Sequence, residues 1–246
     1  MKLLFAFVTD AGLKREINQD SVFSYADERF GLFCVADGVG GSSHGEIASS
    51  MITDALKVWS DERMNDKEMD FLESLDSLEK TLVEVNDRVY ERFKEASISA
   101  STAVILFLCG DKYALLSVGD SRVYYHRYFT HKILTRDDTW ENSCEASDNF
   151  SPEDIINHPN RGKLIKAIGK QIGVVPQIVT APVKSKTRFL LCSDGLYKCC
   201  PEKTIYMYMG KANRKDGFKS AVAGLLDVVY KNGAKDNVSM ILVEVV

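Results

Sequence analysis

The sequence has no apolar run long enough to cross a membrane. A spanning helix needs about 20 consecutive apolar residues, and the longest uninterrupted run, Ala103 to Cys109, has the length of a β-strand. The N-terminal stretch from Met1 to Val8 is apolar, but it stops at Thr9-Asp10 and no small-residue cleavage site follows. It therefore predicts a first strand rather than a signal peptide.

Ligand patterns typical of zinc sites are missing as well. The chain has six cysteines and four histidines, without a Cys-x-x-Cys pair and without a histidine at a zinc-like spacing from a cysteine. Cys34, Cys109 and Cys192 lie inside apolar runs, where cysteine usually behaves as a small buried hydrophobe. Reduced thiols of this kind predict a cytoplasmic location.

A strong net charge is also absent. The formal net charge is −4 over 246 residues, which gives no general affinity for nucleic acid or acidic lipid, so we expect neither as a partner.

Two catalytic motifs are missing too. The segment Gly38-Val39-Gly40-Gly41 lacks the Gly-Lys-Ser/Thr of a P-loop, and no Gly-x-Ser-x-Gly elbow supports acyl transfer.

Short apolar segments of strand length, bounded by turn residues, recur along the chain. They are Leu3–Val8, Leu32–Ala36, Ala103–Leu108, Tyr113–Val118, Val123–Tyr125, Phe189–Cys192 and Val238–Val245. Turns such as Cys109-Gly110-Asp111 and Gly119-Asp120-Ser121 join consecutive segments. This order favours antiparallel sheets with helices in layers, an α+β arrangement, over a doubly wound parallel sheet.

Helical periodicity covers three segments: Glu46–Ser60, Glu68–Glu95 and Gly217–Lys231. The second stripe also fits a coiled coil, but it covers too few heptads, so one face of a long helix packed on a sheet is preferred. The stretch from Arg136 to Gly162 is polar and weakly patterned. A loop of this length inside a single domain predicts a functional segment.

Five aspartates stand beside the predicted strands. Asp37, Asp120 and Asp194 follow apolar runs, Asp236 precedes the last one, and Asp20 lies between the first two. Taken singly, Asp-Gly and Gly-Asp-Ser are common turn sequences and need no function. Taken together, ionised carboxylates that converge at strand ends repel one another unless a cation lies between them. Oxygen ligands suit Mg²⁺, Mn²⁺ or Ca²⁺.

Five motifs occur in a fixed order along the chain. They are Thr9-Asp10-x-Gly12-x-x-Arg15-x-x-Asn18-Gln19-Asp20, Asp37-Gly38-Val39-Gly40-Gly41-x-x-x-Gly45-Glu46-x-Ala48-Ser49, Val118-Gly119-Asp120-Ser121-Arg122, Leu191-Cys192-Ser193-Asp194-Gly195-Leu196 and Lys235-Asp236-Asn237-Val238. In this order the chain resembles the metal-dependent type 2C serine/threonine protein phosphatases, and the compact bacterial members most closely. The resemblance extends over essentially the whole chain.

This resemblance implies a four-layer α-β-β-α sandwich, with two stacked antiparallel sheets flanked by helices. It implies a single catalytic domain over residues 1–246, with a flap at about 136–163 beside the active site. The implied reaction is hydrolysis of phosphoserine and phosphothreonine by in-line attack of a water or hydroxide that bridges two metal ions. The expected partners are phosphorylated proteins, targets of a serine/threonine kinase, and the expected state is a monomer.

The resemblance also implies a role for each acidic residue. Asp37 would bridge two Mn²⁺ or Mg²⁺ ions. Asp194 and Asp236 would complete one of these sites, and Asp20 and the Gly38 carbonyl would hold the other. A weaker third site would use Asp120 and Asp194. Arg15 would bind the substrate phosphate through its forked guanidinium, although a solvated surface charge is the ordinary fate of an arginine.

Several positions depart from the family pattern. Val39 stands where a proposed general acid is found in animal members, so it cannot protonate the leaving group. Ala100-Ser101-Thr102 replaces the usual Gly-Thr-Thr, which predicts a change in packing. His44 and His158 are expected to be a surface residue and a structural flap residue.

Two other functions fit the same residues. One is a pseudophosphatase that binds without turnover, against which the retention of every acidic ligand argues. The other is a phosphatase that acts on small phosphorylated metabolites, for which the same cluster would serve.

Overall fold

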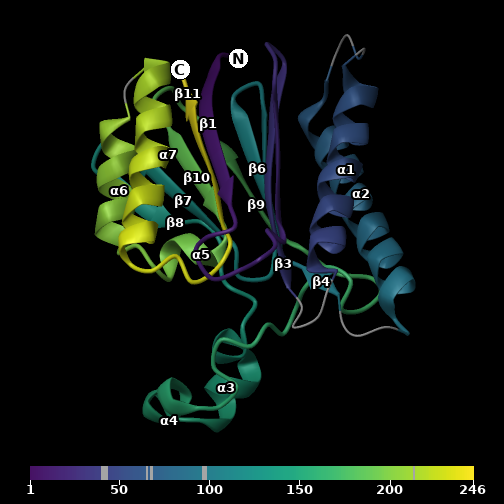
Figure 1. The fold of residues 1–246 in the computed structure, drawn as a ribbon. Coiled ribbons are helices and arrows are strands. Elements are labelled where there is room, and N and C mark those ends of the chain that lie inside the picture. The colour runs from purple at the N-terminus through teal and green to yellow at the C-terminus, as the bar shows by residue number, and fades with distance from the viewer. Residues whose placement is uncertain (40–43, 65, 67–68, 96–98, 213) are drawn as a thin grey trace.

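Two antiparallel sheets lie face to face between two layers of helices (Figure 1). The computed structural model describes residues 1–39, 44–64, 66, 69–95, 99–212 and 214–246. One sheet has the order β1 (Leu3–Asp10), β11 (Val238–Val245), β10 (Arg188–Cys192), β7 (Arg122–Arg127) and β8 (Thr130–Ile133). The other has the order β2 (Asp20–Ala26), β3 (Phe30–Val39), β5 (Ala103–Cys109), β6 (Lys112–Val118) and β9 (Gln177–Pro182), and β4 (Ala100–Ser101) pairs with the end of β3.

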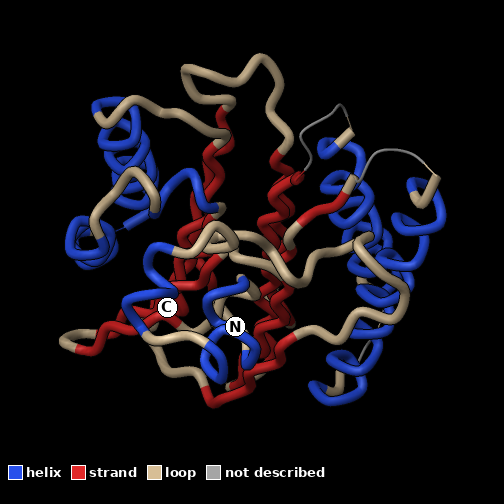
Figure 2. Tube along the Cα trace, turned by 90° about the horizontal axis from the view of Figure 1, so that it is seen from below, coloured by secondary structure: helices blue, strands red, loops and turns tan. Residues whose placement is uncertain are grey.

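Helices cover both outer faces. The six-stranded sheet is covered by α1 (Gly45–Arg63) and α2 (Phe71–Phe93), and the five-stranded sheet by α5 (Asp194–Tyr197), α6 (Glu202–Lys211) and α7 (Arg214–Lys231). Seen from below, the strands of both sheets stand between helices on either side (Figure 2). The four-layer α-β-β-α sandwich expected from the sequence is therefore confirmed.

Three apolar cores hold these four layers together. Strand β3 contributes side chains to two of these cores, because its side chains alternate between the two faces of the sheet. Phe33 and Val35 belong to the core between the sheets, whereas Leu32 and Cys34 belong to the core under α1 and α2. The third core lies between the five-stranded sheet and α5 to α7.

Most predicted elements are present with slightly longer bounds, but the helix predicted over Glu68–Glu95 is shorter, at Phe71–Phe93. Four strands were missed: β2, β4, β8 and β9. Strands β8 and β9 are edge strands with mostly exposed side chains, so they carry no clear apolar pattern. Strand β2 begins at Asp20, which therefore lies at the start of a strand rather than in a loop. The predicted turn at Gly119-Asp120-Ser121 joins two consecutive strands, but it does not form a hairpin, because β6 and β7 belong to different sheets. This turn carries the chain from one sheet to the other.

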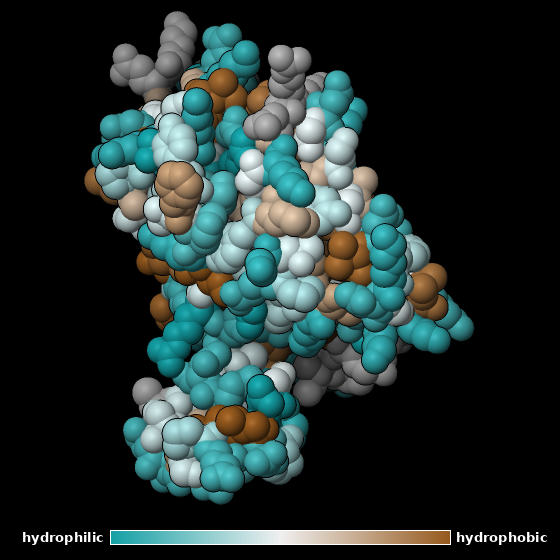
Figure 3. All heavy atoms as spheres, turned by 90° about the vertical axis from the view of Figure 1, so that its left-hand side faces the viewer, coloured by the Kyte–Doolittle hydropathy of each residue, from teal (hydrophilic) through white to brown (hydrophobic). Residues whose placement is uncertain are grey.

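The segment between β8 and β9 forms a small lobe below the sandwich (Figure 1). It contains η1 (Trp140–Asn142), α3 (Cys144–Asn149) and α4 (Pro152–Asn157), where the sequence predicted only a loop. Trp140 supplies its apolar centre, with the His158 ring stacked at 3.9 Å and Phe150 at 5.3 Å. Figure 3 shows the lobe joined to the body by a narrow neck.

We predict that Phe107→Ala lowers the free energy of unfolding by about 3–5 kcal/mol, the usual cost of truncating a buried phenylalanine. Phe107 is fully buried and packs between Trp59 and Phe71, with ring centroids 5.7 Å from each. Urea denaturation measures the loss. The control is Phe129→Ala, since Phe129 is 98% exposed in the β7–β8 turn and its truncation should change stability by less than about 0.5 kcal/mol. Equal losses in the two variants would contradict this account of the core.

Candidate metal centre

The five predicted acidic residues come together at one end of the sandwich. Asp37 lies in β3, and Asp20 is its direct partner across the β2–β3 ladder. Asp194 begins α5 directly after β10, Asp236 precedes β11, and Asp120 lies in the turn between the sheets. The charges of the other four carboxylates all act on Asp37. Asp37 is therefore the centre of the cluster.

The Asp37 carboxyl is difficult to ionise. Burial raises its pKa well above the usual value, and the neighbouring negative charges, Asp20 first, raise it further. Its backbone is held by Thr102, whose N–H donates to the Asp37 carbonyl at 2.8 Å and whose hydroxyl accepts from the Asp37 N–H at 3.0 Å. Ser101 also donates its hydroxyl to the Asp37 carbonyl at 3.0 Å. The sequence predicted only a change in packing at Ala100-Ser101-Thr102. In the structure, Ser101 and Thr102 of this segment also position Asp37.

Asp20 has one satisfied and one unsatisfied oxygen. The residue is 8% exposed, and its Oδ2 accepts a hydrogen bond from the Ser193 hydroxyl at 2.8 Å. Its Oδ1 is buried without a hydrogen-bond partner among the described residues. Burial and the charges of Asp194 and Asp236 raise the pKa of Asp20 to about 6, against hydrogen bonds from Ser239 and Ser193. A buried carboxylate oxygen without a donor is the kind of ligand that a hard cation takes.

Asp120 is buried at the turn between the sheets. It is 6% exposed, and burial followed by the charge of Asp194 raises its pKa to about 6. The turn is fixed from the lobe side, because the Gly119 N–H donates to Asp138 Oδ2 at 3.0 Å and the Asp138 N–H donates back to the Gly119 carbonyl at 2.9 Å. Asp120 therefore has a defined position next to the neck of the lobe.

The remaining two acidic residues are paired with cations. Arg15 binds Asp236 through two hydrogen bonds, Nε to Oδ1 at 2.8 Å and Nη2 to Oδ2 at 3.0 Å. Lys198 donates from Nζ to Asp194 Oδ2. Within the described part of the chain, no three acidic, histidine or cysteine side chains already stand in the arrangement of an ion site.

The role predicted for Arg15 in phosphate binding thus stays a prediction, because its guanidinium holds Asp236 here.

Three glycines follow Asp37 in the quoted motif, and two of them, Gly40 and Gly41, lie outside the described residues. Gly38 is described, and a side chain there would place Cβ 2.4 Å from the carbonyl oxygens of Gln19 and Gly45. Only glycine permits this approach of backbone to backbone beside Asp37.

Gly195 allows a second close approach. A Cβ at this position would lie 1.9 Å from the carbonyl oxygen of Asn237. The start of α5 therefore lies directly against the segment that carries Asp236. Asn237 fixes the same segment to the N-terminal loop, accepting from Gln19 N–H at 2.9 Å and donating to the Ala11 and Ile17 carbonyls at 3.0 Å each.

Sequence reasoning did not assign a role to Asn237, Ser193, Tyr197 or Lys198. The first two stand inside the quoted motifs, so adjacency to Asp236 and Asp194 was an available signal. His158 is structural, as predicted. His44 is half-buried rather than a surface residue, with its ring 5.9 Å from that of Phe93.

The carboxylate set fits a hard divalent cation. All the atoms that could bind an ion are oxygens, and one of them, Asp20 Oδ1, is buried without a hydrogen-bond donor among the described residues. Burial and mutual repulsion raise the pKa values of Asp20, Asp37 and Asp120. A positive ion would relieve that repulsion and lower the cost of ionising all three. We therefore regard the cluster as a candidate site for Mn²⁺ or Mg²⁺.

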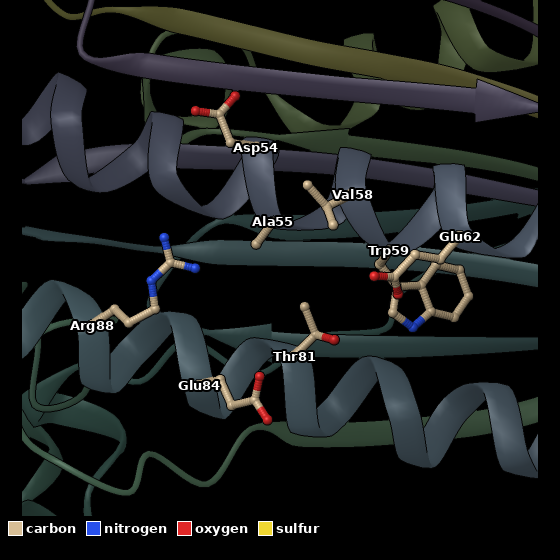
Figure 4. A pocket seen from close by; sticks show the side chains of 8 residues that line it. All are labelled: Asp54, Ala55, Val58, Trp59, Glu62, Thr81, Glu84 and Arg88. Carbon is tan, nitrogen blue, oxygen red and sulfur yellow. The ribbon is translucent and has the colours of Figure 1, made fainter.

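Two surface cavities differ in their relation to the cluster. One, of about 350 Å³, adjoins it and is lined by Gly195, Lys198, Cys199, Asn232, Lys235 and Asp236. The other, of about 260 Å³, lies in the outer helical layer between α1 and α2, with none of the five acidic residues in its lining (Figure 4). It is lined by Asp54, Ala55, Val58, Trp59, Glu62, Thr81, Glu84 and Arg88.

Comparison with known families decides the affiliation. The model of the Protein phosphatase 2C family matches residues 13–243. The chain belongs to this family. The five aspartates singled out in its motifs are the residues that the structure brings together at one end of the sandwich.

Similar proteins are bacterial serine/threonine phosphatases. The chain is 29% identical to the serine/threonine protein phosphatase PstP of Mycobacterium tuberculosis, covering 99% of this chain and 45% of PstP. It thus spans less than half the length of that relative. It is 30% identical to the serine/threonine phosphatase stp of Listeria monocytogenes, covering 97% of this chain and 94% of stp. The PstP catalytic domain solved with two manganese ions superposes with a TM-score of 0.78 at 28% identity, over 99% of this chain and 98% of that one.

We predict that Asp37→Asn raises the free energy of unfolding of the protein in excess chelator at about pH 7.5, because asparagine removes a buried charge that its neighbours repel. The raised pKa of Asp37 means that the folded state holds the proton more tightly than the unfolded state. Stability is therefore lost as pH rises from the unfolded pKa, near 4, through the folded pKa. Near pH 4 the gain from asparagine should shrink.

Urea denaturation at the two pH values measures this effect. Asp54→Asn, an exposed change in α1, is the matched control and should leave stability unchanged. A loss of stability in Asp37→Asn at neutral pH would contradict the repulsion argument.

Proposed function

We propose that the protein hydrolyses phosphoserine and phosphothreonine in phosphorylated proteins, using two Mn²⁺ or Mg²⁺ ions. The observation that supports this most directly is the cluster of five aspartates centred on Asp37. Their mutual repulsion is relieved when cations bind between them. Asp37 would contact both ions, Asp194 and Asp236 would complete one site, and Asp20 with the Gly38 carbonyl would complete the other. When bound, the ions supply the Lewis acidity that makes water nucleophilic near neutral pH.

The chain's own residues then bind and orient the phosphate. Arg15 can reach it, because its side chain is 52% exposed and already lies at the edge of the cluster through Asp236. A guanidinium presents two parallel N–H donors to two phosphate oxygens, as it does to the Asp236 carboxylate here. Exchange of Asp236 for a phosphate would therefore keep both hydrogen bonds of Arg15. Val39 has no proton to donate, so the leaving oxygen takes its proton from another donor.

The lobe is the proposed flap beside the substrate. Its neck is tied to the Asp120 turn by Asp138, and Arg122 is bound to Asp137 with Nη2 to Oδ2 at 2.6 Å. A cavity of about 380 Å³ at this neck is lined by Arg136, Asp137, Asp138, Asn142, Ser143, Ile165 and Gln177. Six of these seven residues are charged or polar, which suits hydrogen bonds to the main chain of a polypeptide substrate.

Residues 1–246 would act as one catalytic domain, as a monomer in the cytoplasm, with no nucleic acid or membrane as partner. No helix among the described residues has the length and apolar character to cross a bilayer.

We predict that protein stripped with chelator is inactive on phosphoserine and phosphothreonine peptides and that Mn²⁺ or Mg²⁺ restores turnover. Asp37→Asn should remove activity at every metal concentration while keeping the fold. Phosphate release from peptides, an aryl phosphate and a sugar phosphate measures the substrate class, with Asp54→Asn as the active control. Full activity in excess chelator would refute the metal centre. Faster hydrolysis of the sugar phosphate would favour a metabolite phosphatase, and metal binding without turnover a pseudophosphatase.

We predict that Arg15→Ala raises KM for a phosphopeptide by roughly 10-fold or more, equivalent to about 1.4 kcal/mol of lost phosphate binding. Arg15→Lys keeps the charge but loses the fork, so it should recover only part of the affinity. Lys14→Ala removes a neighbouring exposed charge and should match the wild type. Steady-state kinetics at saturating Mn²⁺ decide the matter. If Arg15→Ala and Lys14→Ala behave alike, Arg15 is only a surface charge.

A further inference from the structure

Tyr197, the last residue of α5, and Lys198, which follows it, contact the two acidic residues of the expected third ion site. Lys198 donates its ammonium to Asp194 Oδ2. The Tyr197 hydroxyl donates to the backbone carbonyl of Asp120 at 3.0 Å and lies 3.4 Å from its Oδ2. Neither residue belongs to the motifs that indicate the family. The carboxylates that a third divalent ion would need, Asp120 and Asp194, are thus already contacted by the Tyr197 hydroxyl and the Lys198 ammonium.

The local structure holds Lys198 in this place. Asp194 begins α5, and the Lys198 N–H donates to the Asp194 carbonyl at 3.0 Å, so the two side chains lie one helical turn apart on the same face. The Tyr197 ring is held independently, because the Arg122 guanidinium lies 3.7 Å from its centroid. Arg122 is itself bound to Asp137 at 2.6 Å. The arrangement therefore does not depend on one flexible contact.

The charges around Lys198 match those that an ion would meet. The Lys198 ammonium donates to Asp194 Oδ2, and its charge also interacts with those of Asp120 and Asp37. One ammonium therefore acts on three carboxylates of the cluster, although it bonds to only one of them.

We infer that the Lys198 ammonium, supported by the Tyr197 hydroxyl, takes the place of the third divalent ion, so that this protein binds two ions and not three. The inference rests on the proposed metal centre. A third ion would have two protein carboxylates as its only charged ligands, and oxygen sites gain affinity from ligand number and charge. Lys198 takes one oxygen of Asp194 and adds a positive charge beside it. The other oxygen of Asp194 stays available to the main pair.

The inference is tested by counting bound Mn²⁺ in equilibrium dialysis, with the free ion measured by electron paramagnetic resonance. Wild type should bind two ions. Lys198→Met, which keeps length but removes charge, should bind a third, at least about tenfold more weakly than the pair because it has fewer ligands. Asp120→Asn added to Lys198→Met should abolish this third ion. Lys198→Arg should bind two ions, as should Lys235→Met, which removes a nearby exposed lysine without an ion pair to Asp194.

The outcomes separate this inference from the proposed function. Two ions in both wild type and Lys198→Met, with thermal unfolding unchanged, would overturn the role of Lys198 and leave the metal centre intact. Three ions in wild type would overturn it as well. No bound ion in a folded wild type would refute the metal centre, and the inference with it. Since the Lys198 side chain is 58% exposed, its replacement should not prevent folding.

Discussion

The arrangement of this protein depends on the repulsion among carboxylates that meet at one end of two stacked sheets. Four aspartates surround Asp37, and burial together with their negative charges raises the pKa of the Asp37 carboxyl. The chain's own cations counter this repulsion, Arg15 on Asp236 and Lys198 on Asp194. Both carboxylates are also ones that the proposed ions would contact. The same electrostatic demand thus accounts for the two ion pairs and favours divalent cations at the cluster.

The sandwich brings the carboxylates together against that repulsion. The apolar cores on both sides of each sheet fix the strands, so the strand ends that carry Asp20, Asp37 and Asp194 cannot separate without exposing buried surface. Close backbone contacts at Gly38 and Gly195 bring neighbouring segments nearer than any side chain would permit. The free energy of core packing therefore holds a site that is electrostatically unfavourable on its own.

Much of this could be predicted from the sequence. The run Leu32–Ala36 marked a buried strand and placed Asp37 beside it, and the order of the motifs predicted the layers and the acidic cluster. Strand β9 was missed because an exposed edge strand needs no apolar alternation. Helix α4 could have been found, because Ser151-Pro152-Glu153-Asp154 is a helix start, and the Ser151 hydroxyl does accept from Asp154 N–H. The Arg15–Asp236 pair joins residues 221 positions apart, and only the fold could disclose it.

The crossover turn from Gly119 to Ser121 has a mechanical consequence. It joins the end of β6 in the six-stranded sheet to the start of β7 in the five-stranded sheet, and Asp138 at the neck of the lobe both accepts a hydrogen bond from Gly119 and donates one to it. A displacement of the neck therefore either carries Asp120 with it or breaks that clamp. Movement of the lobe and the position of Asp120 are therefore mechanically coupled through the turn that joins the two sheets.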